Sequence, residues 1–262
     1  MLQDKLNKIS KKTKLMALEL CEKTHAGHIG SMLSCVDLMV YTFFQQMKDK
    51  DFFILSKGHA ACGLYCILNL KGLISKQKLK SFYKDGTNLP AHPPACGIDG
   101  IPFATGSLGH GLSLACGLAL GAKLKKSNQQ IYCLLSDGEC NEGSTWEAIN
   151  FAAQNKLDNL TVFLDKNNLQ AFGTTKEVMN MDNMKERWQS FYWDVKECDG
   201  HDFNSIHKAV SSFDKKSIRP KCVIANTIKG KGVSFMENKI EWHYFSMNEE
   251  QYNIAVREIN KQ

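Results

Sequence analysis

The sequence has few prolines, no closely spaced cysteine pair and no long apolar run, and each absence excludes a class of protein. Only 5 of its 262 residues are proline and 43% are hydrophobic, which excludes a disordered chain and indicates a folded, globular one. The 10 cysteines include no Cys-x-x-Cys pair, and several lie inside apolar runs. This pattern indicates buried, reduced thiols of a cytoplasmic protein, not a zinc site or a disulfide framework.

No segment of the sequence predicts insertion into a membrane. Residues 1–21 alternate charged residues with leucine and lack the continuous apolar core of a signal peptide. The longest uncharged run of small and apolar residues, 111–122, is too short to cross a bilayer. The net charge of +6 is modest, and the scattered lysines are not interleaved with aromatic residues. We therefore expect a cytoplasmic protein with no membrane or nucleic-acid partner, whose ligands are anionic and phosphorylated.

Residues 130–173 are typical of a β–α–β unit. Apolar runs at 131–135 and 160–164 are too short for helices and are bounded by polar turns, so we expect two strands there. Between them a helix is predicted to begin at Ser144, because Glu147 three residues later would complete a capping box.

Other segments continue the alternation of strands and helices. We expect helices over residues 4–24, 34–46, 60–70, 188–194 and 204–213, strands over 51–55 and 221–227, and irregular chain over 173–187. A chain of this length fits one large domain, residues 1–262. The predicted fold class is α/β, a doubly wound and mostly parallel sheet with helices on both faces.

Polar residues follow both strands of the β–α–β unit. Asp137 follows the first strand and Asn167 the second, so a right-handed crossover places both at the carboxyl edge of the sheet. Carboxylate and carboxamide oxygens suit Mg²⁺ or Ca²⁺ when a phosphate completes the coordination, and the backbone at Gly138 adds N–H donors. The sequence thus predicts a metal-bridged diphosphate site. The alternative is that Asp137 and Asn167 only terminate strands.

The same residues resemble the thiamine-diphosphate signature, an acidic-glycine turn followed about thirty residues later by Asp-x-Asn. The intervening words EG, WEA and LDNL resemble transketolase. The resemblance implies a thiamine-diphosphate-binding domain in which Asp137, Asn167 and the main-chain carbonyl of Leu169 hold Mg²⁺, with Ca²⁺ or Mn²⁺ as possible substitutes. Ser136 stands where the signature usually has glycine, and we expect serine to be tolerated if the backbone there is ordinary.

Four histidines lie in further short sequence motifs that resemble those of transketolase. His28 in HAGHIG matches the family's substrate-facing histidine, and His59 in SKGH matches the one beside the diphosphate and the reacting carbon. His92 in LPAHP matches a third active-site histidine. His243 in the Trp-His word matches the histidine that bonds the diphosphate and the substrate. The resemblance implies that these side chains converge on one sugar-phosphate site.

Three other residues gain a role from the resemblance. In the family's TGSLGHG turn, the positions of Gly106 and Leu108 closely approach the cofactor rings, which glycine permits. Glu142 matches a glutamate at the subunit interface that links to the partner's activating carboxylate. Its alternative is a first-turn glutamate favoured by the helix dipole.

Two departures from the family pattern flank the histidines. Ile29 follows His28 where the family usually has proline, which predicts a looser loop. Tyr244 follows His243 in place of glycine, and its ring is expected to narrow the substrate entrance.

The resemblance implies a transferase that moves a two-carbon ketol unit from a ketose phosphate to an aldose phosphate, with histidines exchanging protons near neutral pH. In the family, a second domain carries the glutamate that protonates the aminopyrimidine, and most of the basic residues that bind phosphate. We therefore expect the amino-terminal subunit of a split transketolase. It should be inactive alone and be completed by a carboxy-terminal subunit, in an assembly of two copies of each.

Three alternatives stay open. A component similar to deoxyxylulose-phosphate synthase or to a decarboxylating dehydrogenase would keep the cofactor and change the reaction, although the Trp-His word and the TGSLGHG turn favour transketolase. A non-catalytic relative would bind only the cofactor or a partner, as the departures at Ser136, Ile29 and Tyr244 suggest. The same departures fit a transketolase of a specialised sugar pathway. The sequence does not choose between that and the pentose phosphate pathway.

Overall fold

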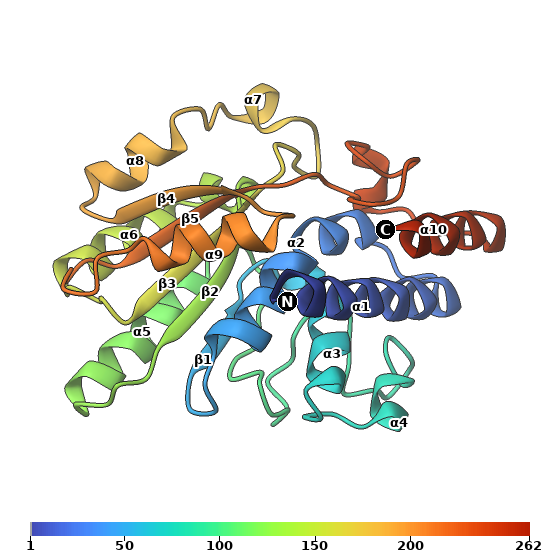
Figure 1. Ribbon diagram of the computed structural model, residues 1–262, viewed down its shortest axis with the longest axis horizontal. Helices are drawn as coiled ribbons and strands as arrows, with labels where there is room; N and C mark the ends of the chain where they lie inside the picture. Colours follow the sequence, from blue (N-terminus) through green and yellow to red (C-terminus); the bar gives the residue numbers. More distant parts are fainter. Residues whose placement is uncertain (1) are drawn as a thin grey trace.

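A five-stranded parallel sheet forms the centre of the computed structural model, which describes residues 2–262 (Figure 1). Its strands are β1 (Phe52–Leu55), β2 (Ile131–Ser136), β3 (Leu160–Lys166), β4 (Asp194–Asp199) and β5 (Lys221–Asn226). They lie in the order β1-β2-β3-β5-β4, and every neighbouring pair is parallel. The predicted α/β fold class is confirmed.

Helices cover both faces of the sheet. The longer ones are α1 (Leu2–Thr24), α2 (Ile29–Tyr41), α3 (Ala61–Leu70), α5 (Gly111–Leu124), α6 (Gly143–Gln154), α8 (Met184–Ser190), α9 (Phe203–Ser211) and α10 (Glu249–Lys261). Two single-turn helices, α4 (Lys76–Leu79) and α7 (Thr175–Val178), lie in connecting segments. One apolar core contains residues of α1, α2, α3, α9 and α10, and the other contains residues of α5, α6 and α8.

Strand β2 shows how the sheet separates the two cores. Tyr132 and Leu134 belong to the core with α1 and α2, whereas Ile131, Cys133 and Leu135 belong to the core with α5 and α6. Successive side chains of a strand point to opposite faces, so a strand covered on both sides is apolar at every position. This is why the sequence of β2 shows a continuous apolar run and not an alternating one.

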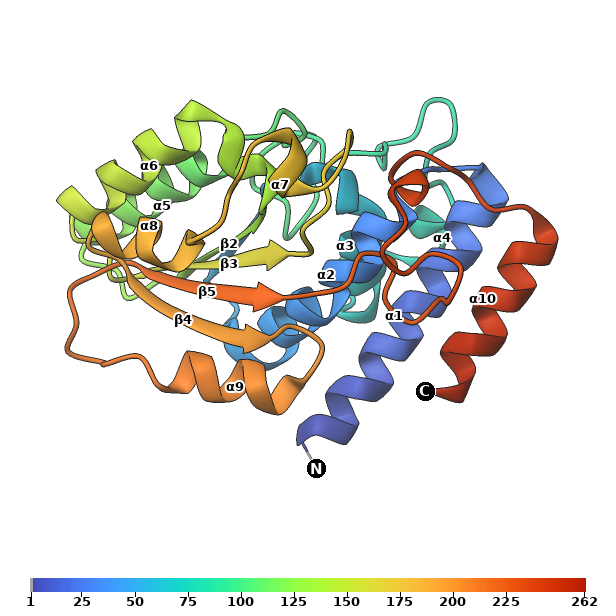
Figure 2. The same ribbon diagram turned by 90° about the horizontal axis from the view of Figure 1, so that it is seen from above.

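The parallel strands bring their carboxyl ends to one edge, as the arrows of Figure 2 show. Ser136 pairs with Asp165 in the register of β2 and β3, so the residues after both strands lie side by side. Ser136 ends β2 and is not among the described residues with positive φ. The backbone at Ser136 is therefore ordinary, which is the condition under which we expect serine to be tolerated.

The segment around β4 corrects the sequence interpretation. Residues 188–194 were expected to be helical, but α8 covers Met184–Ser190 and a strand, β4, begins at Asp194. Only Val195 and Cys198 of β4 are buried, because the strand lies at the edge of the sheet. Two apolar residues in a polar edge strand give too weak a period to detect. The region expected to be irregular also contains α7 and the start of α8.

Helix α2 begins five residues before the predicted start at Ser34. It starts at Ile29 after His28, which adopts the left-handed conformation with φ 65°, and it ends at Tyr41, followed by a π-helical turn, Thr42–Gln46. Every residue of α2 is buried, so no polar face marks its first turn in the sequence.

Helix α6 begins at Gly143, and the predicted capping box at Ser144 is wrong. The Ser144 hydroxyl donates instead to the carbonyl of Gly109 at 3.0 Å, which ties the start of α6 to the glycine-rich turn. Helix α10 was not predicted, although Asn248 and Gln251 form a capping box at its start.

The cysteines fit the expectation of buried, reduced thiols. Nine of the ten cysteines are buried, Cys96 is exposed, and all ten are free. Among residues 2–262, no helix combines the length and apolar character needed to cross a membrane.

Candidate active site

Asp137 and Asn167 meet at the carboxyl edge of the sheet, as the crossover predicts. The Asp137 carboxylate accepts hydrogen bonds from the backbone of Gly138 at 2.8 Å and of Asn168 at 2.6 Å. The Asn167 side-chain oxygen accepts one from the backbone of Leu169 at 3.0 Å. Both residues are buried, and their oxygens are held by the turns that follow β2 and β3. The three proposed metal-ligand residues are therefore adjacent.

Within residues 2–262, the Asp137 carboxylate has no cationic hydrogen-bond partner. Burial, together with the charge of Asp165, raises the pKa of Asp137 to about 7. A bound cation would remove this penalty. Among residues 2–262, no three His, Cys, Asp or Glu side chains cluster as metal ligands. A metal here would need the mixed set of carboxylate, amide and carbonyl oxygens, which is typical of Mg²⁺ sites completed by phosphate.

Asp165, which ends the buried part of β3, is the centre of a separate network. Its carboxylate forms an ion pair with Lys57 and accepts hydrogen bonds from Thr227 and, at 2.6 Å, from Ser34. Burial alone would raise the pKa of Asp165, but the nearby Lys57 ammonium and these hydrogen bonds hold it below its usual value. The Asn167 amide donates to the same carboxylate at 3.2 Å. Asp165 thus orients Asn167.

A cavity of about 180 Å³ opens between these turns. Its lining brings together residues from the loops that follow β1, β2, β3 and β5, namely Ser31, Lys57, His59, Leu108, Ser136, Gly138, Asn141, Glu142, Asn167, Leu169, Gln170, Ala171, Phe172, Lys229 and His243. Two buried polar atoms in this lining, Asn141 Oδ1 and Gln170 Nε2, have no hydrogen-bond partner in the described residues. Unpaired buried polar atoms are costly. A ligand with both donors and acceptors would satisfy them.

Two buried lysines supply positive charge to the cavity. Lys57 donates to the carbonyl of Ser31 at 3.1 Å in addition to pairing with Asp165. The Lys229 ammonium lies 2.8 Å from His243 Nδ1, and burial together with the charge of Lys57 lowers its pKa to about 8. Two cations near one neutral imidazole form a site for an anion, and this chemistry fits a diphosphate.

The four predicted histidines lie close together at this edge, and two of them, His59 and His243, line the cavity. The ring centre of His28 lies 5.5 Å from that of His59, 5.9 Å from that of His92 and 5.2 Å from that of His243. The backbone N–H of His28 also donates to the carbonyl of His243 at 3.1 Å. Four loops distant in sequence therefore place imidazoles around one space.

The pKa of each of the four imidazoles lies below its usual value, which favours the neutral form at neutral pH. Burial lowers the pKa of His28 to about 4, and burial together with the Lys229 charge lowers that of His243 to about 3. Burial also lowers the pKa of His59 and of His92. Neutral imidazoles can accept a proton or donate a hydrogen bond to sugar hydroxyls.

The glycine-rich turn lies against the histidines. Gly106 has φ 152°, and a Cβ there would approach the His92 ring to 3.1 Å. Leu108 and Glu142 both line the cavity. Glu139, one turn from Asp137, is buried and accepts a hydrogen bond from the backbone of Gly109 at 2.8 Å. This contact fixes the turn beside the proposed metal ligands.

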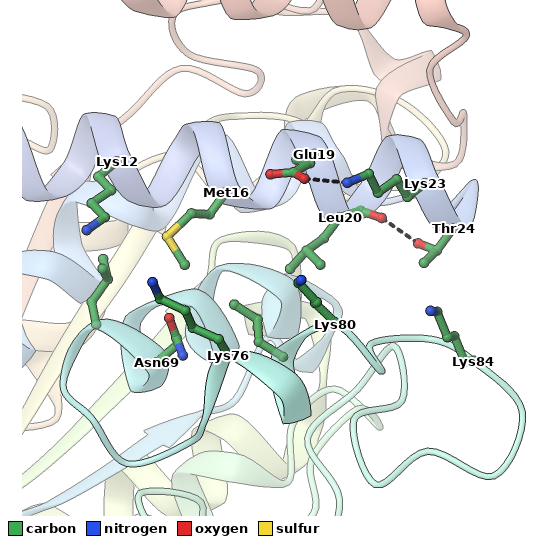
Figure 3. A pocket seen from close by; sticks show the side chains of 12 residues that line it. Lys12, Met16, Glu19, Leu20, Lys23, Thr24, Asn69, Lys76, Lys80 and Lys84 are labelled. Atoms are coloured by element: carbon green, nitrogen blue, oxygen red, sulfur yellow. Dashed lines mark hydrogen bonds and ion pairs between the residues drawn. The ribbon is translucent and has the colours of Figure 1, made fainter.

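A larger cavity, about 700 Å³, lies elsewhere, between α1 and the segment around α4 (Figure 3). Lys12, Lys76, Lys80 and Lys84 line it, together with the exposed ion pair of Lys23 and Glu19. It contains none of the predicted site residues. Its volume alone therefore does not identify it as a catalytic site.

The sequence interpretation missed several residues of the site. Lys57 lies in the SKGH motif and Lys229 in the glycine-rich segment after β5, but only the neighbouring histidine and glycines were considered. The burial of the two lysines was not predicted. Lysine in a glycine-rich loop after a strand is the signal that could have found them. Asn141 and Gln170 have no such signal, because their role depends on which atoms lack partners in the fold.

Comparisons with known proteins agree with this geometry. Residues 6–259 match the family model described as transketolase, thiamine diphosphate binding domain. The chain is 40% identical to an apulose-4-phosphate transketolase subunit of Phocaeicola vulgatus over 261 residues, 96% of this chain and 92% of that protein. It is 37% identical to a 6-deoxy-6-sulfo-D-fructose transketolase subunit of a Clostridium species over 270 residues, 100% of this chain and 97% of that protein.

Full-length transketolases match over part of their length. Human transketolase is 34% identical over 272 residues, which cover 100% of this chain and 42% of the human protein. The crystal structure of Campylobacter jejuni transketolase superposes with a TM-score of 0.90 at 29% identity, over 97% of this chain and 42% of that chain. With the matched residues, the sheet order and the convergent edge, these findings show that the chain belongs to the transketolase family of transferases, as its thiamine-diphosphate-binding domain.

Proposed function

We propose that this chain is the amino-terminal subunit of a transketolase that moves a two-carbon ketol unit from a ketose phosphate to an aldose phosphate. The observation that carries the proposal is the convergence of a buried carboxylate, two buried lysines and four histidines at one edge of the sheet. Both lysines and two of the histidines, His59 and His243, line the cavity. On this proposal residues 1–262 form one diphosphate-binding domain.

Each residue at the edge has a role in this proposal. Asp137, Asn167 and the Leu169 carbonyl hold Mg²⁺, while Lys57 and Lys229 bind the diphosphate. His59 and His243 would add hydrogen bonds to the diphosphate. The Gly138 backbone N–H, which was also expected to do so, is donated to the Asp137 carboxylate at 2.8 Å. Gly106 and Leu108 approach the cofactor rings. When bound, thiamine diphosphate supplies a carbanion equivalent and an electron sink.

The histidines hold the substrate and move protons. The rings of His28 and His92 lie 5.9 Å apart by their centres, and neither residue lines the diphosphate cavity, so we assign both to the sugar. Both have a pKa below the usual value. A neutral imidazole at pH 7 can accept a proton from a sugar hydroxyl and return it. The Lys229 ammonium donates to His243 Nδ1, so the other ring nitrogen of His243 carries the proton.

A partner chain completes the site in this proposal. Similar chains of nearly the same length are named as transketolase subunits, and full-length relatives extend well beyond the matched region. The cavity of about 180 Å³ is smaller than the roughly 300–1,000 Å³ typical of small-molecule sites, which fits a site shared between chains. Glu142 lines it and would face the partner. We expect two copies of each subunit.

A specialised sugar is the second candidate for the substrate. Two of the similar chains are named for apulose 4-phosphate and 6-deoxy-6-sulfo-D-fructose. Tyr244 supports this candidate, because its ring lies 4.8 Å from that of His243 and 6.1 Å from that of His28. An aromatic ring at this position restricts which ketose can reach the histidines.

Ketol transfer tests the proposal. The chain is mixed with the carboxy-terminal subunit encoded beside it, thiamine diphosphate and Mg²⁺, and transfer from xylulose 5-phosphate, apulose 4-phosphate and 6-deoxy-6-sulfofructose is measured. Turnover of any donor in the mixture, and none with either chain alone, would support the split enzyme. Cofactor binding without turnover of any donor would favour the non-catalytic relative.

A further inference from the structure

His201 lies outside the cavity, at the corner that follows β4, and connects two buried elements. One ring nitrogen, Nδ1, lies 2.8 Å from the Asp37 carboxylate of α2. The other, Nε2, accepts a hydrogen bond from the backbone N–H of Ile228 at 2.9 Å. The side chain of His201 is 10% exposed and that of Asp37 is 5% exposed. Neither residue was predicted from the sequence.

The two hydrogen bonds determine the tautomer of His201. A backbone N–H can only donate, so Nε2 must carry a lone pair and the ring proton must be on Nδ1. That proton is donated to Asp37, which is also paired with Lys14 at 3.1 Å and hydrogen-bonded by Ser10. Asp37 is thus a fixed anion, and it holds a neutral imidazole in one orientation.

The Ile228 backbone leads directly to the cavity. Ile228 lies between Thr227, whose hydroxyl donates to Asp165, and Lys229, whose ammonium lies 2.8 Å from His243 Nδ1. The corner approaches this segment closely, because a Cβ at Gly200 would lie 2.4 Å from Thr227 Cγ2. Ile228 lies beyond the end of β5, and its backbone N–H donates to the His201 side chain and not to a neighbouring strand.

We propose that His201 is a positioning residue: it connects Asp37 to the Ile228 backbone and so aims the Lys229 ammonium at His243 and into the cavity. A side chain as long as lysine amplifies a small rotation of its own peptide, so an unanchored Ile228 would let the ammonium leave the cavity. What the ammonium then meets, a diphosphate, rests on the proposed function. The anchoring itself does not.

Two substitutions test whether the hydrogen bond from the Ile228 backbone to residue 201 is needed, or whether any polar side chain at this position is enough. His201→Gln places an amide oxygen near the position of Nε2 and keeps an acceptor for Ile228. His201→Asn is shorter, so it reaches Asp37 and leaves the Ile228 N–H without an acceptor. His207→Asn is the matched control, because His207 of α9 contacts Tyr41 and Ser211 and not the loop after β5.

Hydrogen exchange of the free chain gives the first readout. We expect amide exchange in residues 226–230 to rise at least about tenfold in His201→Asn, and to stay near wild type in His201→Gln and in the control. In the wild-type chain, a ¹⁵N–¹⁵N coupling across the Ile228 N–H to His201 Nε2 bond should be detectable by NMR. The coupling does not depend on any variant folding.

Calorimetric titration of thiamine diphosphate with Mg²⁺, in the presence of the carboxy-terminal subunit, gives the second readout. Outer-shell partners commonly affect affinity by about 10–100-fold, and we expect a loss of this size in His201→Asn and recovery in His201→Gln. The proposal is overturned if the coupling is absent, if exchange is unchanged in His201→Asn, or if His201→Gln is equally impaired. Failure of the wild-type chain to bind would contradict the proposed function, and hydrogen exchange would then decide whether His201 anchors Ile228.

Discussion

A buried aspartate lies at the end of each of the strands β2 and β3. The two aspartates differ in whether a positively charged side chain neutralises the carboxylate. Asp165 has Lys57, Ser34 and Thr227 around its carboxylate, and its pKa lies below the usual value. Asp137, one strand away, accepts only backbone N–H groups, and its pKa is raised to about 7. A compensated charge stabilises the fold, whereas an uncompensated one at a cavity needs a ligand. The difference separates a structural carboxylate from a ligand-binding one.

Removing the cation beside Asp165 should have the largest effect. In Lys57→Met the Asp165 carboxylate would be buried without its counter-ion, and breaking such a pair costs about 3–5 kcal/mol in the free energy of unfolding. Urea denaturation of the free chain measures this loss. The double variant with Asp165→Asn should recover part of it. Equal stability of Lys57→Met and wild type would show that Asp165 is not compensated by this lysine.

The matching change at β2 should spare the fold and abolish ligand binding. Asp137→Asn removes a buried charge that has no counter-ion, but it also replaces one of two acceptor oxygens by an amide group that faces a backbone N–H donor. The free energy of unfolding should therefore fall by much less than in Lys57→Met. Loss of a direct metal ligand should weaken binding of thiamine diphosphate with Mg²⁺ by more than the roughly 10–100-fold typical of outer-shell changes. Calorimetry and urea denaturation check both parts. Large destabilisation without a change in affinity would reverse the roles assigned to the two aspartates.

The histidine cluster should make the free chain acid-sensitive. The folded-state pKa values of His28 and His243, about 4 and about 3, lie below the usual 6.5. Between these values the two histidines bind more protons in the unfolded chain, so their contribution to stability is full above about pH 6.5 and is lost as the pH drops toward 4. The raised pKa of Asp137 contributes with the opposite sign. The slope should decrease in His28→Asn, measured by urea denaturation across this range. NMR titration of either imidazole near pH 6.5 would contradict the prediction.

The smallest effect should come from the exposed ring at the rim. Tyr244→Ala opens the space beside His243 and should lower the KM of bulkier ketoses by less than about tenfold. Phe245→Ala is the matched control, because Phe245 is similarly exposed, at 57% against 56%, and contacts Trp242 instead. A similar change in both variants would mean that Tyr244 does not set the specificity.

The sequence was most informative where local pattern and function coincide. Strands β2 and β3, the turns at Asp137 and Asn167, and the order of the histidine-bearing loops could be predicted, because each combines an apolar run with polar residues at its end. Strand β4 could not be predicted, because only two of its residues are buried at the edge of the sheet.

The rest of the site depends on pairings distant in sequence. Lys57 meets Asp165 across 108 residues, and His201 meets Asp37 across 164. No local pattern encodes such contacts, since the sheet order creates them. The start of α2 was also hidden, because a helix buried on all sides shows no polar face.

The role of Asp137 as a metal ligand in a shared cofactor site can be tested by calorimetric titration of thiamine diphosphate with Mg²⁺ into the wild-type chain, with and without the carboxy-terminal subunit. We expect Mg²⁺-dependent binding that is tight with the partner and weak or absent without it, and that is lost in Asp137→Asn. Absence of binding in the presence of the partner would rule out the cofactor site, and binding that Asp137→Asn leaves unchanged would rule out Asp137 as a ligand.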